Sequence, residues 1–313
     1  MPIRYMTIEE INRAAANPLR FIQDSEAEYD ALLVEAAQRI LTVSEEKPIV
    51  LLSGPSGSGK TTSALRIEAL LDGWGHECHT LSMDNYYYRD ESLVIPVDDE
   101  GQPDLETPLI VDSALLREHI QGLIRGETVH IPSFDFVAQQ RRPERTPMRR
   151  GPGEIIVIEG IHALNPEVVG ADAHSWGTGV YVSVRTRIKD PNGFVLHPSK
   201  VRLLRRLMRD RRGRGQSFED TVTRFRSVNR GERLYIMPHK HHADISIDTF
   251  CPYELSVYRD ILLEGLFAMD PEFMEDMDVS DMAPMLRQVA PMAMEGIKRE
   301  ALIREFIGGG MVE

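Results

Sequence analysis

The eight residues Gly54-Pro55-Ser56-Gly57-Ser58-Gly59-Lys60-Thr61 fit the pattern G-x-x-x-x-G-K-[ST], the phosphate-binding P-loop or Walker A motif. The apolar run before it, residues 48–52, is typical of a buried parallel strand, and residues 62–71 have apolar side chains at helical spacing. Glycines let backbone N–H groups converge on phosphate oxygens, and a helix N-terminus adds partial positive charge. The order strand, glycine loop, helix predicts a nucleoside triphosphate site.

The residues expected to contact the triphosphate lie in or directly after this motif. Lys60 would place a positive charge on the β- and γ-phosphates, and the Thr61 hydroxyl can ligate Mg²⁺. The other candidates are Gly54, Ser56, Gly57, Ser58, Gly59 and Thr62.

Composition bounds the class of protein. The 313 residues are enough for roughly two domains, and 42% hydrophobic with 27% charged residues is ordinary for a globular chain. The net charge of −13 argues against general nucleic-acid binding. There are only two cysteines, no apolar run of membrane-spanning length and no recognisable signal peptide, so we expect a cytoplasmic enzyme.

Two acidic residues follow strands that are predicted to belong to the same sheet. Asp84 comes at the end of a strand over residues 76–83, where open α/β sheets place ligands, and is a candidate general base or metal neighbour. Glu159 ends the apolar strand 154–159 in the manner of a Walker B element, which supports Mg²⁺ directly or through water. Taken alone, a strand-end aspartate such as Asp84 more often caps a loop.

An arginine-dense helix is expected over residues 200–212. In a chain of net charge −13 this density indicates a nearby polyanion, and the triphosphate is the natural candidate. We therefore expect a phosphate-closing lid near residues 190–216. An RNA-binding helix and a solvated face paired with acids are the alternatives.

Helical segments flank the predicted core of residues 46–250. In the N-terminal segment 1–45, Thr7 and Glu10 form a candidate capping box, Pro18 is expected to interrupt the helix, and a second helix is predicted over residues 25–43. The C-terminal segment 251–313 is predicted to be helical, with methionines that fill its core. A solvated loop is the favoured interpretation of the acidic stretch 91–111.

Taken in order, several motifs resemble the uridine kinase/phosphoribulokinase family of P-loop kinases, and most closely its bacterial nucleoside kinases. They are GPSGSGKTT at 54–62, MDNYY at 83–87, DEGQPDLE at 99–106, IPSFDF at 131–136, IVIEGIHALNP at 157–166 and RLLRRLMRDRRGRG at 202–215. The resemblance covers residues 46–313 and implies a three-layer α/β fold with a mostly parallel sheet. It also implies transfer of the γ-phosphoryl group of ATP, with Mg²⁺, to the 5′-hydroxyl of a ribonucleoside.

The same resemblance implies roles for single residues. Asp84 matches the carboxylate that accepts the hydroxyl proton, and Asp104 matches the acid that holds the ribose hydroxyls. The implied acceptor pocket also contains Tyr87, Phe134, Phe136 and Arg141. The implied lid arginines that reach the phosphates are Arg206, Arg209 and Arg214, so Lys60, Asp84, Arg206 and Arg209 form the expected catalytic set.

Two residues differ from the pattern of the related enzymes and leave the identity of the acceptor open. Gln139 stands where related enzymes carry a histidine that reads the pyrimidine, and Gln216 replaces a second lid-end arginine. Uridine or cytidine is therefore a default. A sugar phosphate or pantothenate kinase and a non-catalytic ATP-binding regulator are the alternatives. We expect a small-molecule substrate, no nucleic-acid or membrane partner, and a homo-oligomer.

Overall fold

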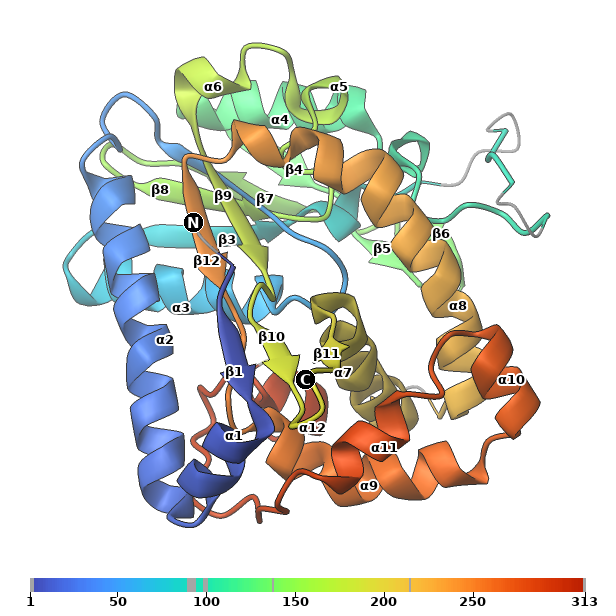
Figure 1. Ribbon diagram of the computed structural model, residues 1–313. Helices are drawn as coiled ribbons and strands as arrows, with labels where there is room; N and C mark the ends of the chain where they lie inside the picture. Colours follow the sequence, from blue (N-terminus) through green and yellow to red (C-terminus); the bar gives the residue numbers. More distant parts are fainter. Residues whose placement is uncertain (1–2, 89–93, 98–100, 137, 214, 312–313) are drawn as a thin grey trace.

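A computed structural model describes residues 3–88, 94–97, 101–136, 138–213 and 215–311. Five parallel strands form its central sheet in the order β12-β9-β2-β8-β3 (Figure 1). Their bounds are β2 Ile49–Ser53, β3 Cys78–Ser82, β8 Ile155–Glu159, β9 Gly177–Ser183 and β12 Ile245–Asp248. The predicted parallel α/β sheet is confirmed.

Alternate side chains of β2 enter two different cores, as the twofold period of a strand requires. Val50 and Leu52 pack in the core that includes α2 (Pro18–Leu41) and α3 (Lys60–Gly73). Ile49 and Leu51 pack in the core that includes α4 (Ser113–Ile124). These side chains are almost fully shielded from water, and each such burial is worth roughly 1.5–3 kcal/mol. The sheet is therefore the middle of three layers.

The N-terminal segment is helical, as predicted, but its helices are divided differently. The capping box between Thr7 and Glu10 is confirmed at the start of α1 (Ile8–Ala15). The predicted break before Pro18 is present, because α1 ends at Ala15, but the second helix begins at Pro18 and not at residue 25. Pro18 stands in the first turn of α2, where its missing N–H costs no hydrogen bond, directly after the N-cap Asn17.

A small second sheet joins the N-terminal segment to residues 187–196. Strand β1 (Tyr5–Thr7) pairs in parallel with β10 (Arg187–Lys189), and β10 pairs with β11 (Val195–Leu196). The segment 185–198 is thus anchored by strand pairing in front of the arginine-rich helix α7 (Pro198–Gly213).

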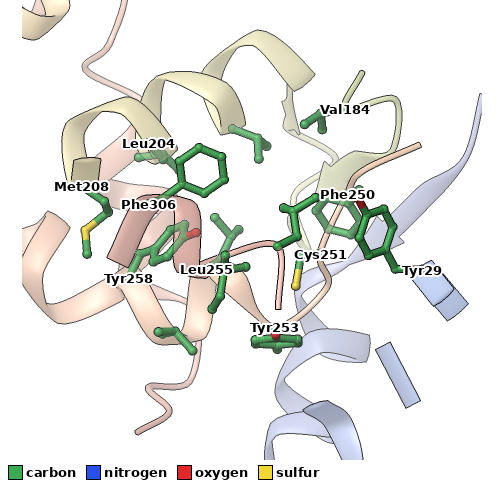
Figure 2. Packing of buried hydrophobic residues seen from close by; sticks show 14 of the residues in the cluster. Tyr29, Val184, Leu204, Met208, Phe250, Cys251, Tyr253, Leu255, Tyr258 and Phe306 are labelled. Carbon is green, nitrogen blue, oxygen red and sulfur yellow. The ribbon is translucent and has the colours of Figure 1, made fainter. Parts of the chain in front are cut away.

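The C-terminal segment packs into the same core as α2, α3 and α7. Figure 2 shows Phe306 and Tyr258 of this segment beside Leu204 and Met208 of α7. The bounds are α8 Phe218–Gly231, α9 Glu254–Ala268, α10 Pro271–Asp276, α11 Met282–Arg287 and α12 Arg304–Ile307. Helix α8 is followed directly by a π-helical turn, Glu232–Ile236.

Most of the remaining elements lie near α4 or near β3, which is an edge strand of the central sheet. They are the paired strands β4 (Thr128–Ile131) and β7 (Thr146–Arg149), the paired strands β5 (Phe134–Asp135) and β6 (Gln140–Arg141), and the short helices α5 (Pro166–Val169) and α6 (Ala173–Trp176). In the described ranges, no helix has the length and apolar character needed to cross a membrane.

Candidate active site

A cavity of about 380 Å³ opens where the P-loop meets the ends of β3 and β8. It brings together most of the side chains predicted from sequence. These are Ser56, Gly57, Gly59, Lys60, Thr61, Asp84, Tyr87, Phe134, Phe136, Gln139, Glu159, Arg206 and Arg209. Gly54, Ser58, Thr62, Asp104 and Arg141 do not line it. Arg214 lies outside the described residues.

The P-loop backbone has the form that a phosphate cradle requires. A Cβ on Gly54 would lie 2.0 Å from the Val182 carbonyl oxygen, so the loop and β9 approach too closely for a side chain. Gly57 and Gly59 have φ angles of 76° and 82°, in the left-handed region that favours glycine. Lys60 begins α3 directly after this turn, so its side chain and the helix N-terminus lie at the cavity.

Glu159 and Thr61 both line the cavity and carry oxygen atoms that can ligate a metal ion. Glu159 is buried at the end of β8 and accepts a 2.7 Å hydrogen bond from the Ser82 hydroxyl of β3. Burial raises the pKa of Glu159, and the nearby Lys60 charge opposes that rise. A carboxylate and a hydroxyl are ligands that suit Mg²⁺, so these residues fit the expected ion.

Helix α7 places two of its arginines at the cavity and keeps a third in the core. Arg206 donates a 2.6 Å hydrogen bond to the Ser56 hydroxyl, and Arg209 donates to Asp210 at 3.0 Å. Arg205 forms an ion pair of 2.6 Å with Glu254, and both side chains are fully buried. The arginines of α7 therefore contribute both to the cavity and to the buried core. Closure of residues 190–216 over the phosphates as a lid stays a prediction.

Three aromatic rings line the same cavity and form what is here called the aromatic wall. Tyr87, Phe134 and Phe136 lie edge to face with centroids 5.1 to 6.0 Å apart. Burial raises the pKa of Tyr87 well above its ordinary value, so its hydroxyl stays neutral. Gln139 reaches the cavity from a left-handed backbone with φ 54°, and its amide donates to the Phe136 carbonyl at 2.6 Å.

Arg141 lies behind this wall. Its guanidinium donates to the Tyr86 and Tyr87 carbonyl oxygens, each at 3.1 Å, and to the Asp112 carboxylate at 3.0 Å. Asp112 is also the N-cap of α4. These contacts make Arg141 a positioning residue for the aromatic wall in this structure.

Asp104 is held away from the cavity by two partners. Its buried carboxylate accepts hydrogen bonds from Arg230 at 2.7 Å and from the Tyr235 hydroxyl at 2.9 Å. The ribose contact that the resemblance implied for Asp104 stays a prediction. In this conformation a different acid of the same loop, Glu106, lines the cavity.

Sequence reasoning missed two carboxylates of the site. Glu106 was counted within a solvated acidic loop, yet one of its carboxylate oxygens is buried without a hydrogen-bond partner. Burial raises its pKa to about 7, although Arg206 and Lys60 oppose the rise. Glu305 reaches the cavity from α12 and accepts a 2.6 Å hydrogen bond from the Thr62 hydroxyl. Glu106 is the last residue of the quoted motif DEGQPDLE, but nothing in that motif distinguishes its role from that of Asp104, and no quoted motif contains Glu305.

Comparisons with known proteins agree with this geometry. The family model described as "Phosphoribulokinase / Uridine kinase family" matches residues 49–255, more than half of the chain. A protein named uridine kinase from Geobacillus kaustophilus is 31% identical over 204 residues, which are 64% of this chain and 86% of the relative. A protein of the same name from Halobacterium salinarum is 31% identical over 199 residues, 63% of this chain and 77% of the relative.

Among solved structures, a candidate fructose transport system kinase from Silicibacter sp. TM1040 has a TM-score of 0.46 and 19% identity. The match covers 68% of this chain and 98% of that protein. Apart from Glu305, all residues that line the cavity lie within the family match, residues 49–255. The chain therefore belongs to the phosphoribulokinase/uridine kinase family and is a phosphotransferase.

Proposed function

We propose that this chain transfers the γ-phosphoryl group of ATP to the 5′-hydroxyl of a ribonucleoside, with uridine or cytidine as the default acceptor. One observation carries the proposal. A single cavity joins the P-loop residues Lys60 and Thr61, the strand-end acid Asp84 and the aromatic wall around Phe134. The residues expected to hold the donor phosphates and the aromatic rings expected to hold the acceptor thus line one cavity, together with the proposed base Asp84.

Each group has a role that phosphoryl transfer requires. Lys60, Arg206 and Arg209 neutralise charge on the phosphates, which is the main electrostatic demand of the reaction. Asp84 accepts the proton of the attacking hydroxyl, and an ordinary carboxylate is a sufficient base when alignment dominates catalysis. Thr61 and Glu159 would hold Mg²⁺, which when bound supplies further charge neutralisation at the β- and γ-phosphates.

The distribution of charge favours an uncharged acceptor over a sugar phosphate. In the described wall of the cavity the cations are Lys60, Arg206 and Arg209, and all three come from the P-loop helix or α7. Arg141 is engaged with Asp112, and Arg142 is paired with Asp135 at 3.1 Å. A flat, neutral base packs well against aromatic rings, and the relatives named uridine kinase support a nucleoside.

The test is ATP consumption with Mg²⁺ against uridine, cytidine, purine nucleosides, ribulose 5-phosphate and pantothenate. We expect turnover with one or more nucleosides, and loss of at least about a hundredfold in Lys60→Ala, which removes a transition-state cation. Turnover with only ribulose 5-phosphate or pantothenate would replace the nucleoside assignment. Tight ATP binding without turnover of any acceptor would favour the regulatory alternative.

A further inference from the structure

A second cavity, of about 670 Å³, lies on the other side of the P-loop residue Pro55. It is formed by the end of β9, the strand β10, the start of α7, the helix α8 with its following turn, and the end of α10. It shares no lining residue with the candidate active site. Apart from Pro55 and Arg202, its lining residues lie outside the motifs quoted above, and no step of the proposed reaction uses it.

The wall of this cavity is strongly cationic. Its basic residues are Arg185, Arg187, Arg202, Arg226, Arg233 and Lys240, and its acids are Glu232, Asp276 and Asp278. Glu232 is paired with Arg202, and Asp278 is paired at 3.5 Å with Lys200, which lies outside the wall. The wall thus has six basic and three acidic residues, whereas acidic residues outnumber basic ones in the whole chain, whose net charge is −13.

Two titratable groups in the wall have lowered pKa values, mainly because they are buried and in smaller part because basic side chains lie nearby. Burial, together with the charges of Arg187 and Arg202, lowers the pKa of His197. Burial, together with the charge of Arg185, lowers the pKa of Lys240, and the acid Glu232 opposes that change only in part. The wall of the cavity therefore carries more basic than acidic side chains, and the basic ones lie close enough to shift each other's titration.

The helix α7 adds to the positive charge of the wall. Its first residues, Pro198 and Ser199, line the cavity, so the positive end of a 16-residue helix dipole lies at the wall. Arginine presents a planar fork of N–H donors that matches phosphate oxygens, and several arginines around one cavity favour a ligand with more than one anionic oxygen. The volume of about 670 Å³ is within the range of small-molecule sites.

We propose that this cavity is a binding site for a small molecule that carries phosphate groups, separate from the ATP and acceptor sites. The cavity also adjoins the donor site through one residue. Arg202 donates to the Ser56 carbonyl oxygen at 3.0 Å, and Arg206, one helical turn later, donates to the Ser56 hydroxyl at 2.6 Å. The first arginine lines the second cavity and the other lines the active site.

The test must keep the P-loop occupied, because any phosphate compound can also bind there. The protein is saturated with Mg²⁺ and a non-hydrolysable ATP analogue, and glucose 1,6-bisphosphate is titrated into it by calorimetry. We expect binding at one site that weakens with added salt, and no binding of glucose. Arg187→Ala and Arg233→Ala should each weaken it about tenfold, which corresponds to about 1.4 kcal/mol.

Arg224→Ala is the matched control, because Arg224 is exposed on α8 and does not line the cavity. Its affinity should equal that of the wild type, and thermal melting checks that every variant is folded. The proposal fails if no binding is seen, or if Arg224→Ala loses as much affinity as the cavity variants. Equal or tighter binding of the polycarboxylate tricarballylate would overturn the assignment to phosphate.

Discussion

Replacing Glu106 by glutamine should stabilise the protein at alkaline pH and change little at acidic pH. The pKa of Glu106 is raised from 4.5 to about 7, chiefly by burial. Near pH 4 the carboxyl is protonated in both the folded and the unfolded chain and contributes no difference. As pH rises from about 4.5 to about 7, the unfolded chain loses this proton more easily, so the wild type loses stability.

The size of the effect follows from the shift. Each pH unit is worth about 1.4 kcal/mol, so the cost of ionising Glu106 in the folded chain reaches about 3 kcal/mol above pH 7. Partial exposure of the side chain reduces this to about 2–3 kcal/mol. Glutamine keeps the shape of the neutral acid without this cost.

The assay is denaturant unfolding of the wild type and Glu106→Gln at pH 5 and at pH 8. The stability difference between the two proteins should be small at pH 5 and should grow by about 2 kcal/mol or more at pH 8. A difference that is the same at both pH values would refute the reasoning, because glutamine would then act through packing alone. If the wild type instead gains stability relative to Glu106→Gln as the pH rises, the predicted direction of the pH dependence is wrong.

Three further variants test other parts of the structure. Arg205→Ala leaves the buried Glu254 without its partner and should lower the free energy of unfolding by about 3–5 kcal/mol, measured by denaturation. Asp104→Asn should cost about 3 kcal/mol in the same assay and raise the KM for the acceptor more than that for ATP; an equal rise in both would remove Asp104 from acceptor binding. Glu305→Gln should tighten binding of a non-hydrolysable ATP analogue about tenfold in calorimetry, because like charges a few Å apart repel by about 1–2 kcal/mol. Weaker binding would show that Glu305 supports the nucleotide.

The parts of the site that sequence predicted are encoded locally. The P-loop, Asp84 after β3 and Glu159 at the end of β8 each depend on a strand followed directly by its functional residue. Parallel strands bring such residues to the same edge of the sheet, so neighbours in space could be inferred from separate motifs. The order of the motifs was enough to predict the fold.

The parts that sequence missed depend on contacts between distant segments. Asp104 and Glu106 are chemically equivalent in the sequence, and Arg230, 126 positions after Asp104, holds the first of them away from the cavity. Gly231 of α8 lets that helix approach Glu106, since a Cβ there would lie 2.2 Å from the Glu106 Cβ. Glu305 meets Thr62 across 243 positions. No local sequence pattern can encode contacts between residues so far apart along the chain.

Asp84→Asn tests the central claim most directly, because the account places donor and acceptor on either side of this carboxylate. Initial rates of uridine phosphorylation are measured together with the affinity for the ATP analogue. The account predicts a loss of about 10²–10⁴ in the rate, as for a positioned proton acceptor, with unchanged nucleotide affinity and an unchanged fold. A variant that phosphorylates the nucleoside at the wild-type rate would contradict the account.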